Sequence, residues 1–95
     1  VMAANGYPAA YEKGSAIKNL EAAEAMDDVK VFHAGTKNSD SGEVVTNGGR
    51  ILAVTGKGDS VAKALENSYN GISKISWKDE YHRTDIGQDI LRLLD

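Results

Sequence analysis

The stretch that decides the fold covers residues 43–55, which read Glu-Val-Val-Thr-Asn-Gly-Gly-Arg-Ile-Leu-Ala-Val-Thr. It holds two short runs rich in β-branched and aliphatic residues, 43–46 and 51–55, a composition typical of half-buried strands. Between them stands Asn47-Gly48, a pair that tolerates the positive φ angles of a type I′ turn. We therefore predict a hairpin in which the strand over 51–55 runs antiparallel to the strand over 43–46.

A long helix is predicted directly after this hairpin. Gly56 and Gly58 interrupt the strand, and either Asp59 or Ser60 can cap the helix that follows. The apolar residues beyond the cap recur at the three- and four-residue spacing of one helical face, and they are Val61, Leu65, Tyr69, Ile72 and Ile75. We expect this stripe to cover one face of the sheet.

The strand, glycine pair and helix also resemble the opening of a dinucleotide-binding site, where glycines let the backbone approach a pyrophosphate. Three features weigh against that interpretation. Val61 stands where the third glycine would be, the Gly-Lys-Ser/Thr of a phosphate-binding loop is missing, and the incoming strand is expected to be antiparallel. A simple loop followed by a helix start is the favoured interpretation.

Upstream of the hairpin, a short helix is predicted over 19–26, with Asn19 as a plausible N-cap ahead of strong helix formers. A strand is expected over 29–36 and a loop over 37–42. A last short helix is expected over 87–94. The order of elements predicts an α+β fold with a small, mostly antiparallel sheet packed with two to three helices.

The composition excludes several classes of function. The chain has 95 residues, enough for one domain, and no cysteine, which excludes disulfides, thiolate metal sites and cysteine nucleophiles. The formal net charge of −3 argues against a nucleic-acid partner, and no apolar run approaches the roughly 20 residues that span a bilayer. No metal motif, no Ser/His/Asp arrangement and no paired carboxylates stand out. We predict no catalytic and no metal-binding residue in this chain.

A candidate anion site lies in Asn47-Gly48-Gly49-Arg50. Backbone N–H groups in a glycine-rich turn can bind an anion, and the planar Arg50 guanidinium can grip a phosphate through two hydrogen bonds. The alternative is a hairpin with a surface arginine. His33 and Thr36 are expected within reach of this turn if segments 29–36 and 43–48 pair, although a lone strand histidine is more often structural. The small residues of His-Ala-Gly-Thr at 33–36 would let another chain or a ligand come close.

Several blocks of this sequence resemble the C-terminal region of the phosphoribosylamine–glycine ligase (glycinamide ribonucleotide synthetase) family, in the ATP-grasp superfamily. The match runs in order across essentially all 95 residues. The blocks that carry it are Val1-Met2-Ala3 with Gly6-Tyr7-Pro8, Tyr11-x-Lys13-Gly14, Val31-Phe32-His33-Ala34-Gly35-Thr36, residues 44–55, and Arg83-x-Asp85-Ile86-Gly87.

The resemblance implies that residues 1–95 form the C-terminal domain of a longer chain, akin to the rudiment single hybrid motif. The whole enzyme would be a cytoplasmic ligase of purine biosynthesis that joins 5-phosphoribosylamine and glycine. It would use ATP and Mg²⁺ bound by upstream ATP-grasp and N-terminal domains, with neither bound by this part. The C-terminal domain would help to wall the acceptor substrate's site, with Arg50 meeting a phosphate or ribose.

Two departures from the family pattern fall near the C-terminus. His82 stands where an aromatic residue usually precedes the arginine, and Gln88-Asp89-Ile90 replaces a frequent Trp-Arg-Ala. Because the chain opens on Val1 rather than methionine, we interpret it as a fragment with an exposed apolar patch near the Gly6-Tyr7-Pro8 loop. The alternative interpretation is a stand-alone, non-enzymatic domain that binds a partner through its sheet.

Overall fold

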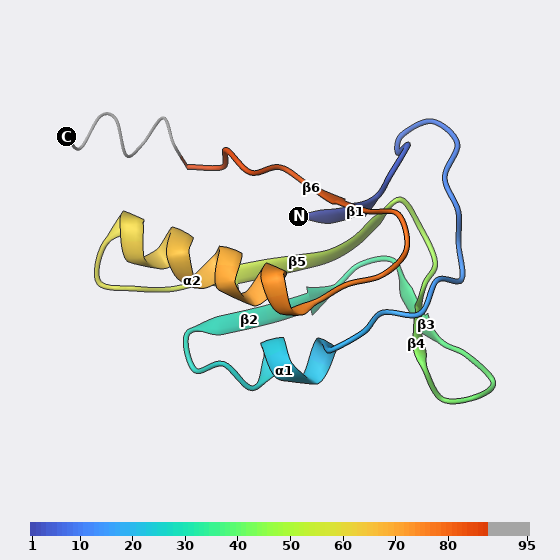
Figure 1. Cartoon of the computed structure of the whole chain (residues 1–95), viewed down its shortest axis with the longest axis horizontal. Coiled ribbons are helices and arrows are strands. Elements are labelled where there is room, and N and C mark those ends of the chain that lie inside the picture. Colours follow the sequence, from blue (N-terminus) through green and yellow to red (C-terminus); the bar gives the residue numbers. More distant parts are fainter. Residues whose placement is uncertain (88–95) are drawn as a thin grey trace.

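The computed structural model describes residues 1–87, which fold into two helices and six strands (Figure 1). Residues 88–94 of the predicted last helix lie outside the described residues. In chain order the elements are β1 (Met2–Ala4), α1 (Leu20–Glu24), β2 (Val29–His33), β3 (Thr36–Asn38), β4 (Val44–Thr46), β5 (Arg50–Gly56), α2 (Val61–Lys74) and β6 (Glu80–His82).

The main sheet has four strands in the order β2-β5-β1-β6, and every neighbouring pair is antiparallel. A separate two-stranded ribbon pairs β3 with β4. The long strand β5 lies inside the main sheet, where Ile51 and Leu52 are completely buried. The α+β prediction with a mostly antiparallel sheet is confirmed.

The predicted hairpin across Asn47 and Gly48 is wrong. Strand β4 pairs with β3, whereas β5 pairs with β2 on one side and with β1 on the other. Neither Asn47 nor Gly48 has the positive φ that a type I′ turn requires. The connection 47–49 instead carries the chain from the ribbon into the main sheet, where pairing on both edges buries the apolar side chains of β5.

The single strand predicted over 29–36 is in fact two strands, because the chain changes sheets at Ala34 and Gly35. The N–H groups of both residues donate to the Ile51 carbonyl oxygen, at 2.9 and 3.1 Å. Strand β3 then begins at Thr36 and includes the first two residues of the predicted 37–42 loop. A side chain at position 35 would place Cβ 2.5 Å from the Arg50 carbonyl oxygen, so this crossing requires glycine.

The helix prediction after Gly58 is confirmed in type and in cap. Ser60 rather than Asp59 caps α2, and its Oγ accepts a hydrogen bond from the Lys63 N–H at 3.1 Å. Ile72 and Ile75 of the predicted stripe are buried in the core, and the other three members are partly buried. The shorter helix α1 covers part of the predicted 19–26 helix, and Asn19 stands at its N-cap position without a side-chain cap.

The two glycines before α2 serve packing. Strand β5 is antiparallel to both neighbours. A Cβ on Gly56 would lie 2.5 Å from the Ala64 carbonyl oxygen, and one on Gly58 would lie 2.8 Å from the Ala64 nitrogen. Because they lack a Cβ, both glycines let the connection between β5 and α2 lie in close contact with α2. This supports the interpretation as a loop over that as a dinucleotide-binding turn.

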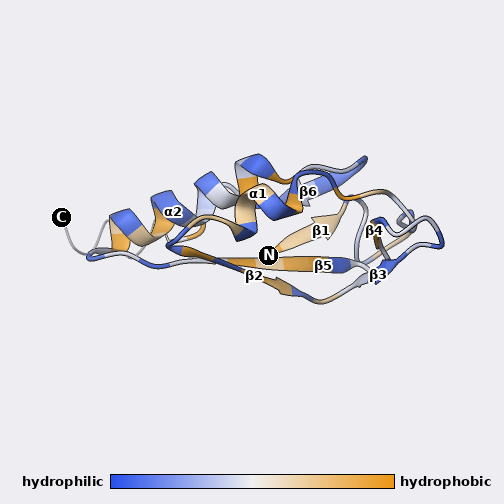
Figure 2. Ribbon diagram, turned by 90° about the horizontal axis from the view of Figure 1, so that it is seen from below, coloured by the Kyte–Doolittle hydropathy of each residue, from blue (hydrophilic) through white to orange (hydrophobic). Residues whose placement is uncertain are grey.

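Both helices lie on the same side of the main sheet (Figure 2). The core forms between them and that face of the sheet, and its buried members are Met2, Leu20, Ala23, Val29, Val31, Ile51, Leu52, Ile72, Ile75 and Trp77. The opposite face of the sheet carries no helix within residues 1–87.

Candidate functional site

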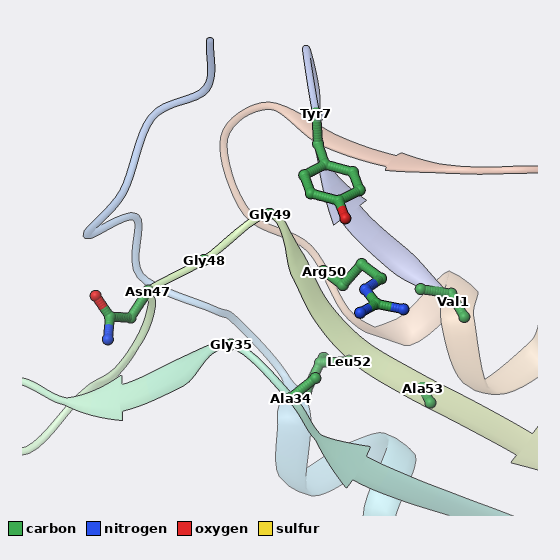
Figure 3. Close-up of a pocket in the computed structure, with 10 residues that line it drawn as sticks. All are labelled: Val1, Tyr7, Ala34, Gly35, Asn47, Gly48, Gly49, Arg50, Leu52 and Ala53. Atoms are coloured by element: carbon green, nitrogen blue, oxygen red, sulfur yellow. The ribbon is translucent and has the colours of Figure 1, made fainter. Parts of the chain in front are cut away.

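An open pocket of about 480 Å³ lies where the chain enters β5 (Figure 3). Its wall comes from the N-terminus, the loop after β1, the crossing between β2 and β3, and the connection into β5. The lining residues are Val1, Tyr7, Ala34, Gly35, Asn47, Gly48, Gly49, Arg50, Leu52 and Ala53. None of them is acidic.

The pocket brings together the four consecutive residues that the sequence singled out, Asn47 to Arg50. Figure 3 shows the Arg50 side chain inside the pocket, with its guanidinium directed toward Val1, while the Asn47 carboxamide points away from it. Of the four, Arg50 and the two glycines therefore face the space that a ligand would fill.

His33 and Thr36 do not line this pocket. The His33 Nδ1 and the Thr36 Oγ1 lie 2.8 Å apart and share a hydrogen bond. This bond spans Ala34 and Gly35, which do line the pocket. The predicted pairing of segments 29–36 and 43–48 forms only between Thr36–Asn38 and Val44–Thr46, as the β3–β4 ribbon. Strand β2 pairs with β5 instead, and the His33 side chain stays exposed.

Close backbone packing explains the glycines of the pocket. The Asn47 N–H donates to the Gly35 carbonyl oxygen at 2.7 Å, and the Ala4 N–H donates to the Gly49 carbonyl oxygen at 2.8 Å. A Cβ on Gly48 would lie 3.3 Å from the Gly35 Cα. Within residues 1–87, the N–H groups of Gly48 and Gly49 donate no hydrogen bond to another part of the chain.

Arg50 is a cation without an anionic partner in the part of the chain that the structure describes. Arg83 is the contrast. Its Nε and a terminal guanidinium nitrogen donate to the two carboxylate oxygens of Asp85 at 2.9 and 2.8 Å. The shared hydrogen bonds lower the pKa of Asp85 and raise the pKa of Arg83. The Arg50 guanidinium is therefore available to bind an anion, whereas the Arg83 guanidinium already binds the Asp85 carboxylate.

Six residues of the pocket wall escaped the sequence prediction of the site, namely Val1, Tyr7, Leu52, Ala53, Ala34 and Gly35. The only signal for the last two was the small-residue pair inside His-Ala-Gly-Thr, which predicted a close approach by another chain or a ligand. The backbone of 47–50 makes that approach. Nothing local marks Tyr7, because its position against Gly49 depends on the pairing of β1 with β5.

The described residues contain neither a metal-binding cluster nor a membrane-spanning helix. Within residues 1–87, no three side chains of the types His, Asp and Glu gather closely enough to hold a metal ion. In the same range, neither helix combines the length and the apolar character that crossing a membrane would require.

The chain matches a protein-family model described as phosphoribosylglycinamide synthetase, C domain, over residues 1–89. Among curated proteins it is 53% identical over 93 residues to the chloroplastic phosphoribosylamine–glycine ligase of Arabidopsis thaliana, covering 97% of this chain and 18% of the relative. It is 50% identical over 95 residues to the phosphoribosylamine–glycine ligase of Rhodopirellula baltica, covering 100% of this chain and 22% of the relative.

Among solved structures, the chain is similar to the phosphoribosylamine–glycine ligase of Thermotoga maritima, with a TM-score of 0.74 and 34% identity. That match covers 90% of this chain and 20% of the solved chain. This chain therefore spans about a fifth of the length of the ligases that it matches.

Proposed function

The chain belongs to the phosphoribosylglycinamide synthetase C-domain family, and from that premise we propose that residues 1–95 are the C-terminal domain of a phosphoribosylamine–glycine ligase. The complete enzyme joins 5-phosphoribosylamine and glycine into glycinamide ribonucleotide in purine biosynthesis, at the expense of ATP. The rest of the enzyme, including an ATP-grasp region, is supplied by other domains of the same polypeptide. We place the enzyme in the cytoplasm, although the Arabidopsis relative is named as chloroplastic.

Within this enzyme, we propose that the pocket at the start of β5 holds the phosphate or the ribose of phosphoribosylamine. The observation that carries this proposal is the free Arg50 guanidinium in a pocket without a carboxylate. A guanidinium binds phosphate oxygens with paired, charge-assisted hydrogen bonds. The unpartnered N–H groups of Gly48 and Gly49 supply further donors of the kind that bind anions.

We propose that His33 and Thr36 affect this site indirectly, without touching the ligand. Their hydrogen bond at 2.8 Å closes over Ala34 and Gly35, and these two residues form the wall opposite Arg50. We assign the pair to positioning that wall, together with Asn47, whose N–H is bonded to Gly35.

The donors of this pocket do not suit Mg²⁺, which prefers carboxylate and other oxygen ligands. The pocket offers a cation and backbone N–H groups, and it contains no acidic side chain. We therefore assign ATP and Mg²⁺ to the upstream domains and derive no catalytic step from residues 1–87. This domain binds and orients the acceptor substrate.

The test is a product assay on the complete polypeptide that carries this chain, with ATP, Mg²⁺, glycine and phosphoribosylamine. Formation of glycinamide ribonucleotide and ADP supports the proposal. The matched control is residues 1–95 alone, shown to be folded by circular dichroism, which should give neither product. A native complete polypeptide without ligase activity, or turnover by residues 1–95 alone, would overturn it.

A further inference from the structure

Three asparagines of this chain are each followed by glycine, at Asn5-Gly6, Asn47-Gly48 and Asn70-Gly71. Asparagine is among the thermolabile residues of proteins. It can lose its side-chain amide without an enzyme, because the backbone nitrogen of the next residue can attack the side-chain carbonyl carbon. Glycine favours this attack, since it has no Cβ that restricts the backbone. The reaction needs a side chain and a following N–H group that the fold leaves unbound, and the three pairs differ in this respect.

The Asn70-Gly71 pair is held by regular structure. Both residues lie inside α2, where each backbone N–H is bonded to the carbonyl oxygen four residues before it. Gly71 is buried, and a Cβ at that position would lie 2.9 Å from the Val29 side chain on β2. Attack by the Gly71 nitrogen therefore requires the helix to open.

The Asn5-Gly6 pair lies in a closed turn. The Tyr7 N–H donates to the Ala4 carbonyl oxygen at 3.1 Å, so that this bond spans both residues, and Gly6 has a φ of +99°. The Asn5 N–H is also bonded, to the Asp79 carbonyl oxygen at 2.7 Å. A hydrogen-bonded turn fixes the backbone angles of its two central residues. The rotation that would bring the Gly6 nitrogen to the Asn5 side chain must therefore break the turn.

The Asn47-Gly48 pair has neither restraint. Asn47 is exposed, and its side chain points away from the pocket (Figure 3) and makes no hydrogen bond within residues 1–87. The Gly48 N–H donates no bond to another part of the same range, and no backbone hydrogen bond there closes a turn across the pair. Both groups that react are therefore free in the native fold.

We propose that Asn47 is a site of spontaneous deamidation, and that the reaction disables the pocket at Arg50. The Gly48 nitrogen loses its proton to solvent and bonds to the Asn47 Cγ, while the Cγ–Nδ2 bond breaks. The leaving nitrogen takes up a proton and departs as ammonia, which leaves a five-membered succinimide ring. Water then opens the ring at either carbonyl. The products are aspartate and isoaspartate, and each replaces a neutral amide with a carboxylate.

Both products change the wall that residues 47–50 give to the pocket. No lining residue of the pocket is acidic, so the product adds its first carboxylate, which repels a phosphate and competes for the Arg50 guanidinium. Isoaspartate also routes the main chain through the former side chain. This inserts a methylene carbon into the backbone and displaces the N–H groups of Gly48 and Gly49. The effect on binding rests on the proposed function, whereas the deamidation itself does not.

Ageing of the complete ligase polypeptide at mildly alkaline pH tests the site, because base helps the Gly48 nitrogen to lose its proton. Mass spectrometry of a digest made at acidic pH follows all three pairs in one sample, and methyl transfer by an isoaspartyl methyltransferase detects isoaspartate. Asn47 should be converted at least about tenfold faster than Asn70, which reacts only from opened states. Asn5 should also be slower than Asn47. Conversion of Asn47 no faster than that of the other two would overturn the proposal.

Kinetics of the aged enzyme test the effect on the pocket. Anion exchange separates the deamidated form through its added negative charge. Its KM for phosphoribosylamine should be higher by about tenfold or more, the effect of losing one charge-assisted hydrogen bond. An unchanged KM in the form converted at Asn47 would overturn the effect on the pocket.

Two variants locate the cause of this change. Asn47→Gln and its matched control Asn5→Gln each remove one reactive pair, since glutamine must form a less favourable six-membered ring. Each variant is compared with its own fresh sample, so that the effect of the substitution itself cancels. The rise in KM should persist in aged Asn5→Gln and disappear in aged Asn47→Gln. An equal rise in both would assign the damage elsewhere and overturn the proposal. If Asn47→Gln does not fold, the intact and deamidated fractions of the wild type still give the comparison.

Mass spectrometry is independent of turnover, so the two proposals fail separately. Rapid conversion of Asn47 in a polypeptide that has no ligase activity when fresh would overturn the proposed function and keep the deamidation site. An active ligase in which Asn47 stays intact would do the reverse.

Discussion

The ring of Tyr7 packs directly on the backbone of Gly49, so closely that a Cβ on Gly49 would lie 1.8 Å from the Tyr7 Cδ2. This contact joins the loop after β1 to the start of β5. It also places an aromatic wall beside Arg50 (Figure 3). Glycine at position 49 is therefore a requirement of packing, with no positive φ involved.

The contact predicts that Gly49→Ala destabilises the domain by about 1–3 kcal/mol, the usual cost of overpacking. Urea unfolding measures the loss. The control is the double variant Gly49→Ala/Tyr7→Ala, in which the clashing ring is gone, so that the two changes should be clearly non-additive. Additive losses would mean that the ring does not rest on position 49.

Packing of α2 on the sheet gives a second prediction. Ile72 is 7% exposed, whereas Leu65 is only partly buried. We expect Ile72→Ala to lower the free energy of unfolding by about 2–5 kcal/mol. Leu65→Ala should cost less, because part of its side chain already contacts water. A larger loss at Leu65 than at Ile72, measured by urea unfolding, would contradict the orientation of the helix.

The sequence left Asp59 and Ser60 as alternative N-caps of α2, and substitutions at the two positions should have different effects. Ser60→Ala should destabilise the domain by about 1 kcal/mol, since it removes the side-chain acceptor of the Lys63 N–H. Asp59→Ala should have a much smaller effect, and Ser60→Asp should retain most of the stability. Thermal unfolding of the three variants decides the matter, and equal losses at 59 and 60 would go against the assigned cap.

The Arg83–Asp85 pair predicts a pH effect. Hydrogen bonding to Arg83 holds the pKa of Asp85 below its usual 3.8. A carboxyl group with a lowered folded-state pKa stabilises the fold above its unfolded-state pKa, and this contribution is lost as the pH falls through the folded-state pKa. Carbon-detected NMR titration should show the Asp85 midpoint below 3.8, and Arg83→Gln should move it back up. Because the pair is exposed, salt should weaken the shift. A midpoint insensitive to Arg83→Gln would contradict the pairing.

Local signals in the sequence predicted the local structure well. The apolar period from Val61 to Ile75 and the polar residues ahead of it specify α2, because a helix is stabilised by groups three and four positions apart. Strand β6 was not predicted and most of β3 lies in the predicted 37–42 loop, whereas β2, β4 and β5 were found. The pairing partners of these strands were not predicted. Asn47-Gly48 is a strong short-range hairpin signal, but the long-range pairing of β5 with β1 and β2 outweighs it.

The residues of the candidate site fall into the same two groups: those that local sequence marks and those that only long-range pairing brings together. Arg50 and the glycines before it are consecutive and carry recognisable anion-binding chemistry, so the sequence identified them. Tyr7 and Gly35 reach the pocket only through pairings between segments far apart in the chain, which no local pattern encodes. As substrate contacts, His33 and Thr36 remain a prediction, and their observed bond is to each other.

The central claim is that Arg50 binds the phosphate or ribose of phosphoribosylamine, and steady-state kinetics of Arg50→Ala in the complete ligase test it most directly. Loss of a charge-assisted hydrogen bond worth about 1.5–3 kcal/mol predicts a rise of roughly 10- to 150-fold in the KM for phosphoribosylamine. The KM values for ATP and glycine should change little. Arg50→Lys should recover only part of the loss, because the planar fork is missing. Lys63→Ala, on the exposed surface of α2, is the control and should resemble the wild type. An unchanged KM for phosphoribosylamine in Arg50→Ala would contradict the account and leave Arg50 as a surface residue.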